Sequence, residues 1–423
     1  MHELILTDEE MAMQAGHFGP AARIAMRVLS RVAPFYGAER LLEVTRAHID
    51  GCIYAGDTGL AFIEHLAELG GRVRVPSTLN VMSMDRERWR EIGQDERYAA
   101  RARRFGQAYV RMGARPTFTC APYQTDAAPV FGELIAWSES NAVCYANTAI
   151  GARTNRYGDY LDISCALTGR APAAGLYLDE NRKGTHLFNL REVPHSVQER
   201  QDFFPVLGYL IGERCPDGVP VINGLDVEPT SDDLKALCAA AATSGAVALI
   251  HLVGITPEAP DLQTALGGKE PCVEFTVGME DLRQTRAGLT TLRAESVDVV
   301  AFGSPHCSLA ECRELAALMQ DRRAAPGVQV FVTTSSMVRS IGIELGIVQQ
   351  MEAFGAQVTA DTCIAVAPLV KPGAKVLMTN SAKYAHYGPG LIDLESVFGS
   401  TSECVESAVA GRPVIDERAW TEA

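Results

Sequence analysis

The sequence lacks the features of nucleic-acid-binding proteins. Lys and Arg number 38 against 52 Asp and Glu in 423 residues, and only 7% of the residues are aromatic. The resulting net charge of −14 repels nucleic-acid phosphates over long range. No basic cluster interleaved with aromatic side chains occurs. We therefore expect no nucleic-acid partner.

Long apolar runs and targeting segments are also missing. The longest uncharged apolar stretch, residues 245–255, is too short to span a bilayer and contains His251. The first residues, Met1–Leu6, lack the basic segment that opens a signal peptide and include an acidic residue. We expect no membrane association and a cytoplasmic location.

The cysteines form neither a local metal motif nor a disulfide framework. There are 11, an odd number, and no two make a Cys-x-x-Cys pair. Cys120, Cys307 and Cys363 nevertheless each follow an apolar, β-rich run. If these runs are parallel neighbours in one sheet, the three thiols would meet in the crevice at its carboxyl edge. From spacing alone, a shared metal site and plain burial both remain open. We assign burial to seven others: Cys144, Cys165, Cys215, Cys238, Cys272, Cys312 and Cys404.

Hydrophobic periodicity divides the chain into a helical start and a later alternating region. Thr7 and Glu10 form a capping-box pair that opens a first helix, and helical patterns follow at residues 21–32 and 39–44. From about residue 219, expected strands alternate with expected helices, which predicts parallel β-α-β units and an α/β fold. The strands are 219–222, 246–250, 297–302, 328–332, 357–360 and 374–378, and the helices are 232–243, 315–319 and 338–354.

The chain is too long for one ordinary core, because a domain typically takes about 150 residues. The sequence is richer in Pro and Gly near residues 171–175 and 215–221, which marks possible boundaries between lobes. We place three approximate lobes at 1–170, 171–295 and 296–423.

A helix start directly follows Cys307. Ser308 and Glu311 make a second capping box there. The dipole of the helix favours a thiolate on Cys307, and the thiolate is the form that binds metal. His306 beside it is either a donor to the metal ligands or a packing residue.

Three polar motifs lie in sequence segments that are otherwise rich in small residues. Each alone also fits a plain loop or a capped helix, but together they supply hydroxyl, amide and cationic groups. In the second, Arg153 or Arg156 could hold a substrate carboxylate as a bidentate donor. The motifs are His48–Gly59 followed by Pro76–Val81, Glu139–Val143 continuing to Arg156, and Thr379–Gly390.

Taken in order, these segments resemble the catalytic domain of the aconitase X family, a divergent branch of the aconitase superfamily. The resemblance covers nearly the whole chain and implies a multi-lobed, aconitase-like α/β/α architecture with parallel sheets. It also implies an iron–sulfur cluster, of open nuclearity, held by Cys120, Cys307 and Cys363. The matching segments are Ala47–Gly51, Thr119–Tyr123, Ser138–Val143, Ala149–Asn155, His251–Pro260, Gly303–Ser308, Asp361–Cys363 and Thr379–Tyr384.

The resemblance implies a hydro-lyase that removes water from a small hydroxy acid. We expect dehydration of cis-3-hydroxy-L-proline to Δ1-pyrroline-2-carboxylate, with the cluster as a Lewis acid. A separate small subunit, a swivelling domain that carries a catalytic serine, is also expected. The reason is that no second compact unit precedes Met1 or follows Ala423 in the sequence.

Three other functions stay open. Mevalonate 5-phosphate dehydration, again as a large subunit, ranks second. Gly51–Ile53 offers mainly backbone donors to a phosphate, and no Gly-x-x-x-x-Gly-Lys loop occurs. An isomerase of the aconitase type ranks third. A non-catalytic iron–sulfur or zinc-binding scaffold subunit is the alternative from another class, and the polar motifs argue against it.

The resemblance also implies roles for individual residues. The general base is either the serine of the small subunit or a residue of this chain. Lys383, near Ser381, is a candidate for charge stabilisation or proton transfer, and we take these two as the candidate catalytic residues. The expected substrate-binding positions are Gly51, Cys52, Ile53, Asn80, Ser140 and Asn141, to which we add Arg153.

Overall fold

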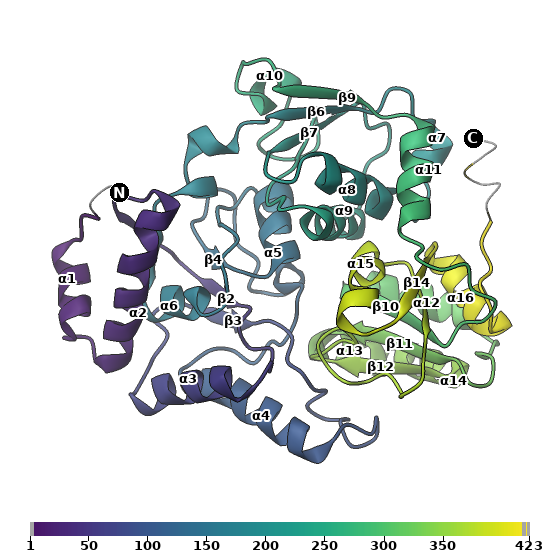
Figure 1. Ribbon diagram of the computed structural model, residues 1–423, viewed down its shortest axis with the longest axis horizontal. Coiled ribbons are helices and arrows are strands. Elements are labelled where there is room, and N and C mark those ends of the chain that lie inside the picture. The colour runs from purple at the N-terminus through teal and green to yellow at the C-terminus, as the bar shows by residue number, and fades with distance from the viewer. Residues whose placement is uncertain (1–3, 417–419, 421–423) are drawn as a thin grey trace.

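The computed structural model describes residues 4–416 and residue 420. Three parts follow one another along the chain, each built around its own parallel sheet (Figure 1). The first part is purple to blue in the figure, the second is teal to green and the third is green to yellow. The α/β fold with several parallel sheets that the sequence predicts is confirmed.

A three-stranded parallel sheet in the order β3-β2-β4 forms the first part. A short antiparallel pair, β1 with β5, joins the start of this part to its end. The helices are α1 (Asp8–Ala15), α2 (Pro20–Val32), α3 (Asp57–Glu68), α4 (Glu96–Arg111), α5 (Ser140–Tyr145), continued by a π-helical turn (Ala146–Ile150), and α6 (Leu161–Thr168). The strands are β1 (Leu41–Glu43), β2 (Ala47–Ile49), β3 (Ser77–Leu79), β4 (Ala136–Trp137) and β5 (Arg170–Pro172).

The second part has a four-stranded parallel sheet in the order β8-β7-β6-β9. Its central helix α9 packs against α5 of the first part and α15 of the third, so it joins the three parts (Figure 1). The elements are β6 (His186–Asn189), α7 (His195–Gln198), α8 (Phe203–Arg214), β7 (Pro220–Asn223), α9 (Ser231–Ser244), β8 (His251–Leu252), α10 (Leu262–Ala265), β9 (Val273–Thr276) and α11 (Met279–Gly288).

The third part has a five-stranded parallel sheet in the order β12-β11-β10-β13-β14. The chain leaves β10 toward one edge and later returns to β13 on the other side, so the strand order reverses between β10 and β13. Ligands of open α/β sheets bind at such a point. The elements are β10 (Val299–Cys307), α12 (Leu309–Met319), β11 (Gln329–Thr334), α13 (Ser336–Glu344), α14 (Ile347–Phe354), β12 (Ala356–Ala360), β13 (Val376–Thr379), α15 (Ala382–Leu391), β14 (Glu395–Phe398) and α16 (Thr401–Ala410).

Local sequence signals explain most of these elements. The predicted capping boxes at Thr7 and Ser308 are both formed, and they open α1 and α12. The first residues of β10 are buried on both faces, as expected for a central parallel strand with an uninterrupted apolar run.

Three predicted elements are wrong. Residues 39–44 contain strand β1 rather than a helix, because Leu41–Glu43 pairs with β5. Residues 246–250 form no strand, and β8 begins only at His251. The helix predicted over 338–354 is two helices, because Gly346 adopts the left-handed conformation, with φ of 74°, between α13 and α14.

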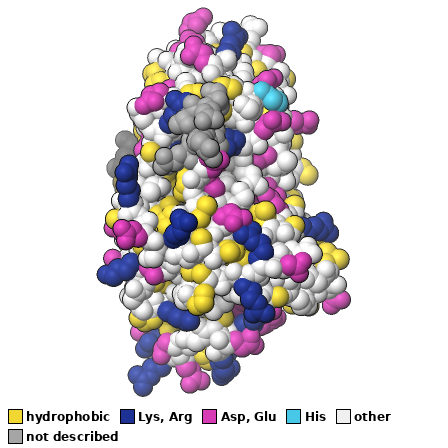
Figure 2. Space-filling view, turned by 90° about the vertical axis from the view of Figure 1, so that its right-hand side faces the viewer, with side chains coloured by type: hydrophobic (Ala, Val, Ile, Leu, Met, Phe, Trp, Pro, Cys, Tyr) yellow, Lys and Arg dark blue, Asp and Glu magenta, His cyan; other side chains and the backbone are white. Residues whose placement is uncertain are grey.

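The described part of the chain has no helix both long and apolar enough to cross a bilayer. On the face shown in Figure 2, acidic and basic side chains are interspersed. This surface offers no extended field of one sign to a polyanion.

Candidate active site

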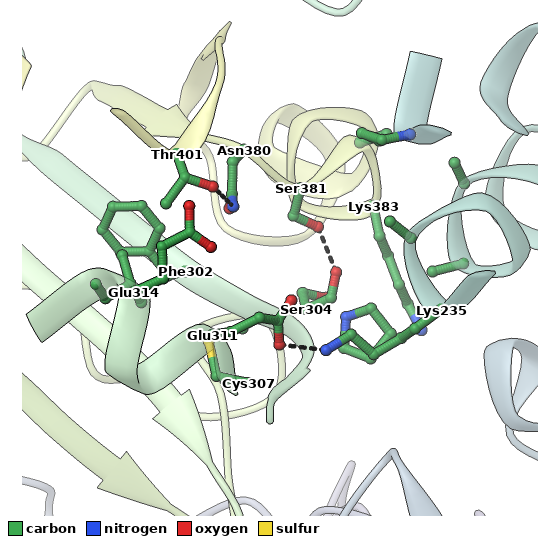
Figure 3. Close-up of a pocket in the computed structure, with 18 residues that line it drawn as sticks. Lys235, Phe302, Ser304, Cys307, Glu311, Glu314, Asn380, Ser381, Lys383 and Thr401 are labelled. Carbon is green, nitrogen blue, oxygen red and sulfur yellow. Dashed lines mark hydrogen bonds and ion pairs between the residues drawn. The ribbon is translucent and has the colours of Figure 1, made fainter. Parts of the chain in front are cut away.

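The irregular carboxyl end of β10, residues 303–307, which we call the β10 loop, meets the loop after β13 where the strand order reverses. The Ser381 hydroxyl donates a hydrogen bond to the backbone oxygen of Ser304 and accepts one from Tyr384 N at 3.1 Å, so Ser381 caps α15 (Figure 3). Gly303 has a φ of +96°, and a Cβ there would lie 2.2 Å from the backbone oxygen of Thr333. The β10 loop therefore approaches β11 more closely than any side chain allows.

A cavity of about 320 Å³ opens between the first and third parts at this point. Segments far apart in the sequence line it, and they bring hydroxyl, amide, carboxyl, thiol and cationic groups together. Its polar and titratable lining residues are Asp50, Asn80, Cys120, Ser138, Glu139, Ser140, Arg156, Tyr157, Ser304, Cys363, Lys383, Tyr384 and Tyr387. We call this the main cavity.

A smaller cavity, of about 60 Å³, adjoins the main cavity and shares Gly303, Ser304 and Lys383 with it (Figure 3). Cys307 and Ser381 line it, together with the buried Lys235 from α9. Lys235 Nζ donates to Asp232 Oδ1 at 2.9 Å and also binds Glu311 of α12. This ion cluster joins the second part to the third directly beside Cys307.

The three predicted metal-binding cysteines lie around the β10 loop. Cys120 and Cys363 line the main cavity, whereas Cys307 lines the smaller one. The interpretation that all three follow strands of one sheet is wrong. Cys307 ends β10 and Cys363 follows β12, both in the third part, but Cys120 comes from the first part.

His306 connects the three cysteine segments. Its backbone N–H donates to Cys120 Sγ at 3.2 Å. Burial lowers the pKa of His306 to about 4, so its ring is neutral. Nε2 then donates to Thr362 O at 3.1 Å, and Nδ1 accepts from the Thr119 hydroxyl at 3.2 Å. The side chain thus holds the neighbours of Cys120 and Cys363 while Cys307 follows it in the chain.

Thiolates are the ligands of iron–sulfur clusters, so the chemistry of the donors fits such a group. In the described residues, however, no three His, Cys, Asp or Glu side chains are gathered as a metal site. Burial raises the pKa of Cys120 to about 12 and also raises that of Cys363. Metal binding to these thiols would therefore release protons.

Lys383 forms an ion pair with Glu139 in the wall of the main cavity. Lys383 Nζ donates to Glu139 Oε1 at 2.6 Å, and Glu139 Oε2 accepts from Ala142 N at 2.7 Å and from the Asn141 amide. Burial lowers the pKa of Lys383, but the charge of Glu139 more than offsets this, and the pKa lies above its ordinary value. Lys383 is therefore a fixed cation and is unsuited to act as a base.

Asp50 faces the same cavity in a different state. Burial raises its pKa, as do the negative charges of Glu139, Asp159 and Asp162, and it reaches about 8 despite the opposing hydrogen bond from Asn80. Its carboxyl is therefore neutral near pH 7 while Glu139 is ion-paired. The sequence did not identify either carboxyl as a functional residue, although each lies inside one of the three polar motifs.

Three family models match nearly the whole chain. Models of the Aconitase X first, second and third domains match residues 3–180, 184–287 and 297–410. The chain is 47% identical, over 97% of its length and 71% of the relative's, to a Pseudomonas aeruginosa protein named cis-3-hydroxy-L-proline dehydratase. The chain belongs to the aconitase X family.

Two further relatives support the assignment of this aconitase X chain. A Methanothermobacter thermautotrophicus protein named phosphomevalonate dehydratase large subunit is 38% identical over 94% of this chain and 96% of the relative. The crystal structure of Thermococcus kodakaraensis aconitase X superposes with a TM-score of 0.85 at 31% identity, over 96% of this chain and 100% of that one. The predicted family and fold are confirmed, and this chain is a hydro-lyase of that family.

The predicted substrate-binding residues of this aconitase X chain fall into two groups. Ile53, Asn80 and Ser140 line the main cavity. Of the rest, Gly51 and Cys52 lie behind the wall, where Gly51 O accepts from Tyr109 and the Cys52 thiol donates to Asn80 O at 3.0 Å. Asn141 is buried and donates to Cys120 O at 2.8 Å. Arg153 binds Asp179 and Tyr177 O, and Arg156 lines the cavity instead.

One of the cysteines assigned to packing differs from that prediction. Cys272 is exposed, whereas Cys144, Cys165, Cys215, Cys238, Cys312 and Cys404 are buried.

Proposed function

We propose that this chain is the catalytic large subunit of a cis-3-hydroxy-L-proline dehydratase, which forms Δ1-pyrroline-2-carboxylate. The observation that carries the proposal is the 47% identity to a protein of that name, against 38% to a phosphomevalonate dehydratase large subunit. The main cavity supports it, because its about 320 Å³ suit a small hydroxy acid and Lys383 and Arg156 offer cations for one carboxylate. Phosphomevalonate dehydration remains the second candidate.

Cys120, Cys307 and Cys363 are the proposed ligands of an iron–sulfur cluster. When bound, the cluster would supply a Lewis-acidic iron. Two observations support this ligand set: the chemistry of the three thiols, and the connection of their segments through His306. The three-lobe division at 1–170, 171–295 and 296–423 also stays a proposal.

Residues of this chain orient the substrate for elimination. In cis-3-hydroxy-L-proline the hydroxyl and the carboxylate share one ring face, so the α-hydrogen lies opposite the hydroxyl. Lys383 stabilises the negative charge that develops on the carboxylate side as the α-proton leaves. We assign the carboxylate contact to Arg156 rather than Arg153, because Arg156 lines the cavity. Asn80 and Ser140 complete the polar wall.

A small swivel-domain subunit is proposed to cover the cavity and to supply the serine base. The names of the archaeal relatives support this, because two proteins called large subunits are matched over 96% and 100% of their lengths. The ion pair with Glu139 supports a charge-stabilising role for Lys383 rather than that of the base. A cytoplasmic location belongs to the same proposal.

Initial rates on three compounds test the function. The anaerobically purified complex with its small subunit should dehydrate cis-3-hydroxy-L-proline, and should turn over the trans isomer at least about 100-fold more slowly, because misplaced reacting groups cost that much. Mevalonate 5-phosphate should be a poor substrate. Equal rates on the two isomers would contradict the opposed-face geometry, and preference for the phosphorylated compound would select the second candidate.

A further inference from the structure

Loss of water from a 3-hydroxy acid needs a proton for the departing oxygen, because hydroxide is a poor leaving group. Among the described residues that line the main cavity, the only carboxyl groups are those of Asp50 and Glu139. Glu139 is engaged through both oxygens, with Lys383 on one and Ala142 N on the other. Both of its oxygens therefore already accept hydrogen bonds from the protein, and Glu139 is not placed to donate one to a molecule in the cavity.

Asp50 differs from Glu139 in its hydrogen bonds. Its Oδ1 accepts from the Asn80 amide, and within the described residues its Oδ2 has no hydrogen-bond partner. Asp50 is partly exposed, and the exposed part faces the main cavity. A proton on Oδ2 would therefore be available to a molecule in the cavity.

Buried side chains hold the backbone around Asp50 through hydrogen bonds. Asp50 N and Gly51 N both donate to Asp162 Oδ2, at 2.7 and 3.0 Å, and Gly51 O accepts from the Tyr109 hydroxyl. Asp162 and Tyr109 are buried. A reacting group needs such support if it is to keep its position within a fraction of an ångström.

We propose that Asp50 is the general acid that protonates the leaving hydroxyl group of the substrate. The inference rests on the proposed dehydratase function and adds a residue to it. As the base takes the α-proton, the electron pair of the Cα–H bond forms the Cα–Cβ double bond. The C3–O bond breaks with its pair on oxygen, and the Asp50 proton converts that oxygen to water. The resulting enamine tautomerises to the imine product, and the Asp50 carboxylate regains a proton from solvent.

Burial and the charges around Asp50 both raise its pKa, to about 8, which favours the acid form at neutral pH. Glu139, Asp159 and Asp162 face it with negative charge and raise its pKa, and Lys383 is the cation nearby. A general acid works best when its pKa lies near the operating pH, and carboxyl groups in active sites are commonly raised for this role. Activity should therefore fall as pH rises through about 8, because Asp50 then loses its proton.

The test compares Asp50→Asn with a matched control, Asp159→Asn, in the reconstituted complex with its small subunit. Asp50→Asn should lower kcat on cis-3-hydroxy-L-proline by about 100-fold or more, as loss of a general acid does. It should also abolish the alkaline limb of the pH profile. Asp159 is exposed and lies outside the cavity lining, so Asp159→Asn should keep the maximal rate within about 2-fold. Asp159→Asn removes a charge that raises the pKa of Asp50, so the alkaline limb of the pH–rate profile of this variant should move to lower pH.

Each outcome decides. An Asp50→Asn rate within about 3-fold of wild type overturns the inference and leaves the dehydratase function intact. A lower rate with an unchanged alkaline limb overturns it too, because the loss is then structural. If Asp50→Asn does not fold, the pH–rate profile of Asp159→Asn decides. An alkaline limb at the same pH as in the wild type would reject Asp50 as the general acid. A wild-type complex inactive on this substrate overturns function and inference together.

Discussion

At the scale of single residues, the main cavity holds charged groups whose states their neighbours set. Lys383 and Glu139 lie 244 positions apart in the sequence and form an ion pair at 2.6 Å. Asp50 forms no ion pair within the described residues, and burial together with the negative charges around it raises its pKa to about 8. The cavity therefore offers the cations of Lys383 and Arg156 and an acidic proton on Asp50, which suits a zwitterionic or anionic hydroxy acid.

Replacing the cation should remove catalysis without removing the fold. Lys383→Met should lower kcat/KM by about 100-fold or more, because a preorganised charge at the reacting centre is worth that much. Lys383→Arg should recover part of the loss. The exposed Lys375→Met serves as a control and should behave like wild type. Steady-state kinetics with thermal unfolding would check this, and a Met variant as active as Lys375→Met would contradict it.

The three proposed ligands should be needed together. Cys120→Ala, Cys307→Ala and Cys363→Ala should each abolish bound iron and acid-labile sulfide after anaerobic reconstitution, because clusters depend on their thiolates. Cys144→Ala should retain both, since its side chain packs in the core of the second part. Iron and sulfide assays with visible absorption provide the measurement. Iron-free wild-type protein after reconstitution would reject the ligand set.

At the scale of elements, apolar patterns predicted the parallel strands well and their interruptions poorly. The apolar runs correctly predicted strands at the positions of β7, β10, β11, β12 and β13. A single glycine in a helical pattern does not reveal whether the helix breaks, and Gly346 does break it. The motifs and the family resemblance implied site roles for Asn80, Ser140, Cys120 and Lys383, and all four line the main cavity. They did not predict Asp50 or Glu139, because a carboxyl's protonation depends on neighbours that sequence does not place.

Gly303 offers a test of the close approach between β10 and β11. Gly303→Ala should destabilise the protein more than Gly373→Ala does. Both residues have a positive φ, 96° and 93°, but a Cβ at 373 meets nothing within 4 Å whereas one at 303 meets Thr333 O at 2.2 Å. The strain common to both should cost about 1–3 kcal/mol, and the clash should add to it. Urea unfolding midpoints would show the difference, and equal midpoints would contradict it.

At the scale of the whole molecule, the site depends on how the three parts are joined. The main cavity lies between the first and third parts, and α9 of the second part packs on both. Its rim carries Leu391, which is 61% exposed. An apolar side chain there is a natural contact for the proposed small subunit.

The isolated chain should therefore be nearly inactive. If the base is a serine of the small subunit, dehydration of cis-3-hydroxy-L-proline should fall by about 100-fold or more without it, since general-base catalysis contributes at least that much. Adding the small subunit should restore the rate in a saturable way. Full turnover by this chain alone would show that one of its own residues is the base.

The buried ion cluster of Lys235, Asp232 and Glu311 has an evolutionary consequence. Lys235 is buried between partly exposed carboxylates of α9 and α12, and leaving a buried charge without its partner costs about 3–5 kcal/mol. A relative that lost the lysine would keep two carboxylates without their cation. Substitutions at these three positions should therefore occur together among relatives. An alignment of relatives in which Lys235 varies freely while both acids persist would show that the joint between the second and third parts tolerates drift.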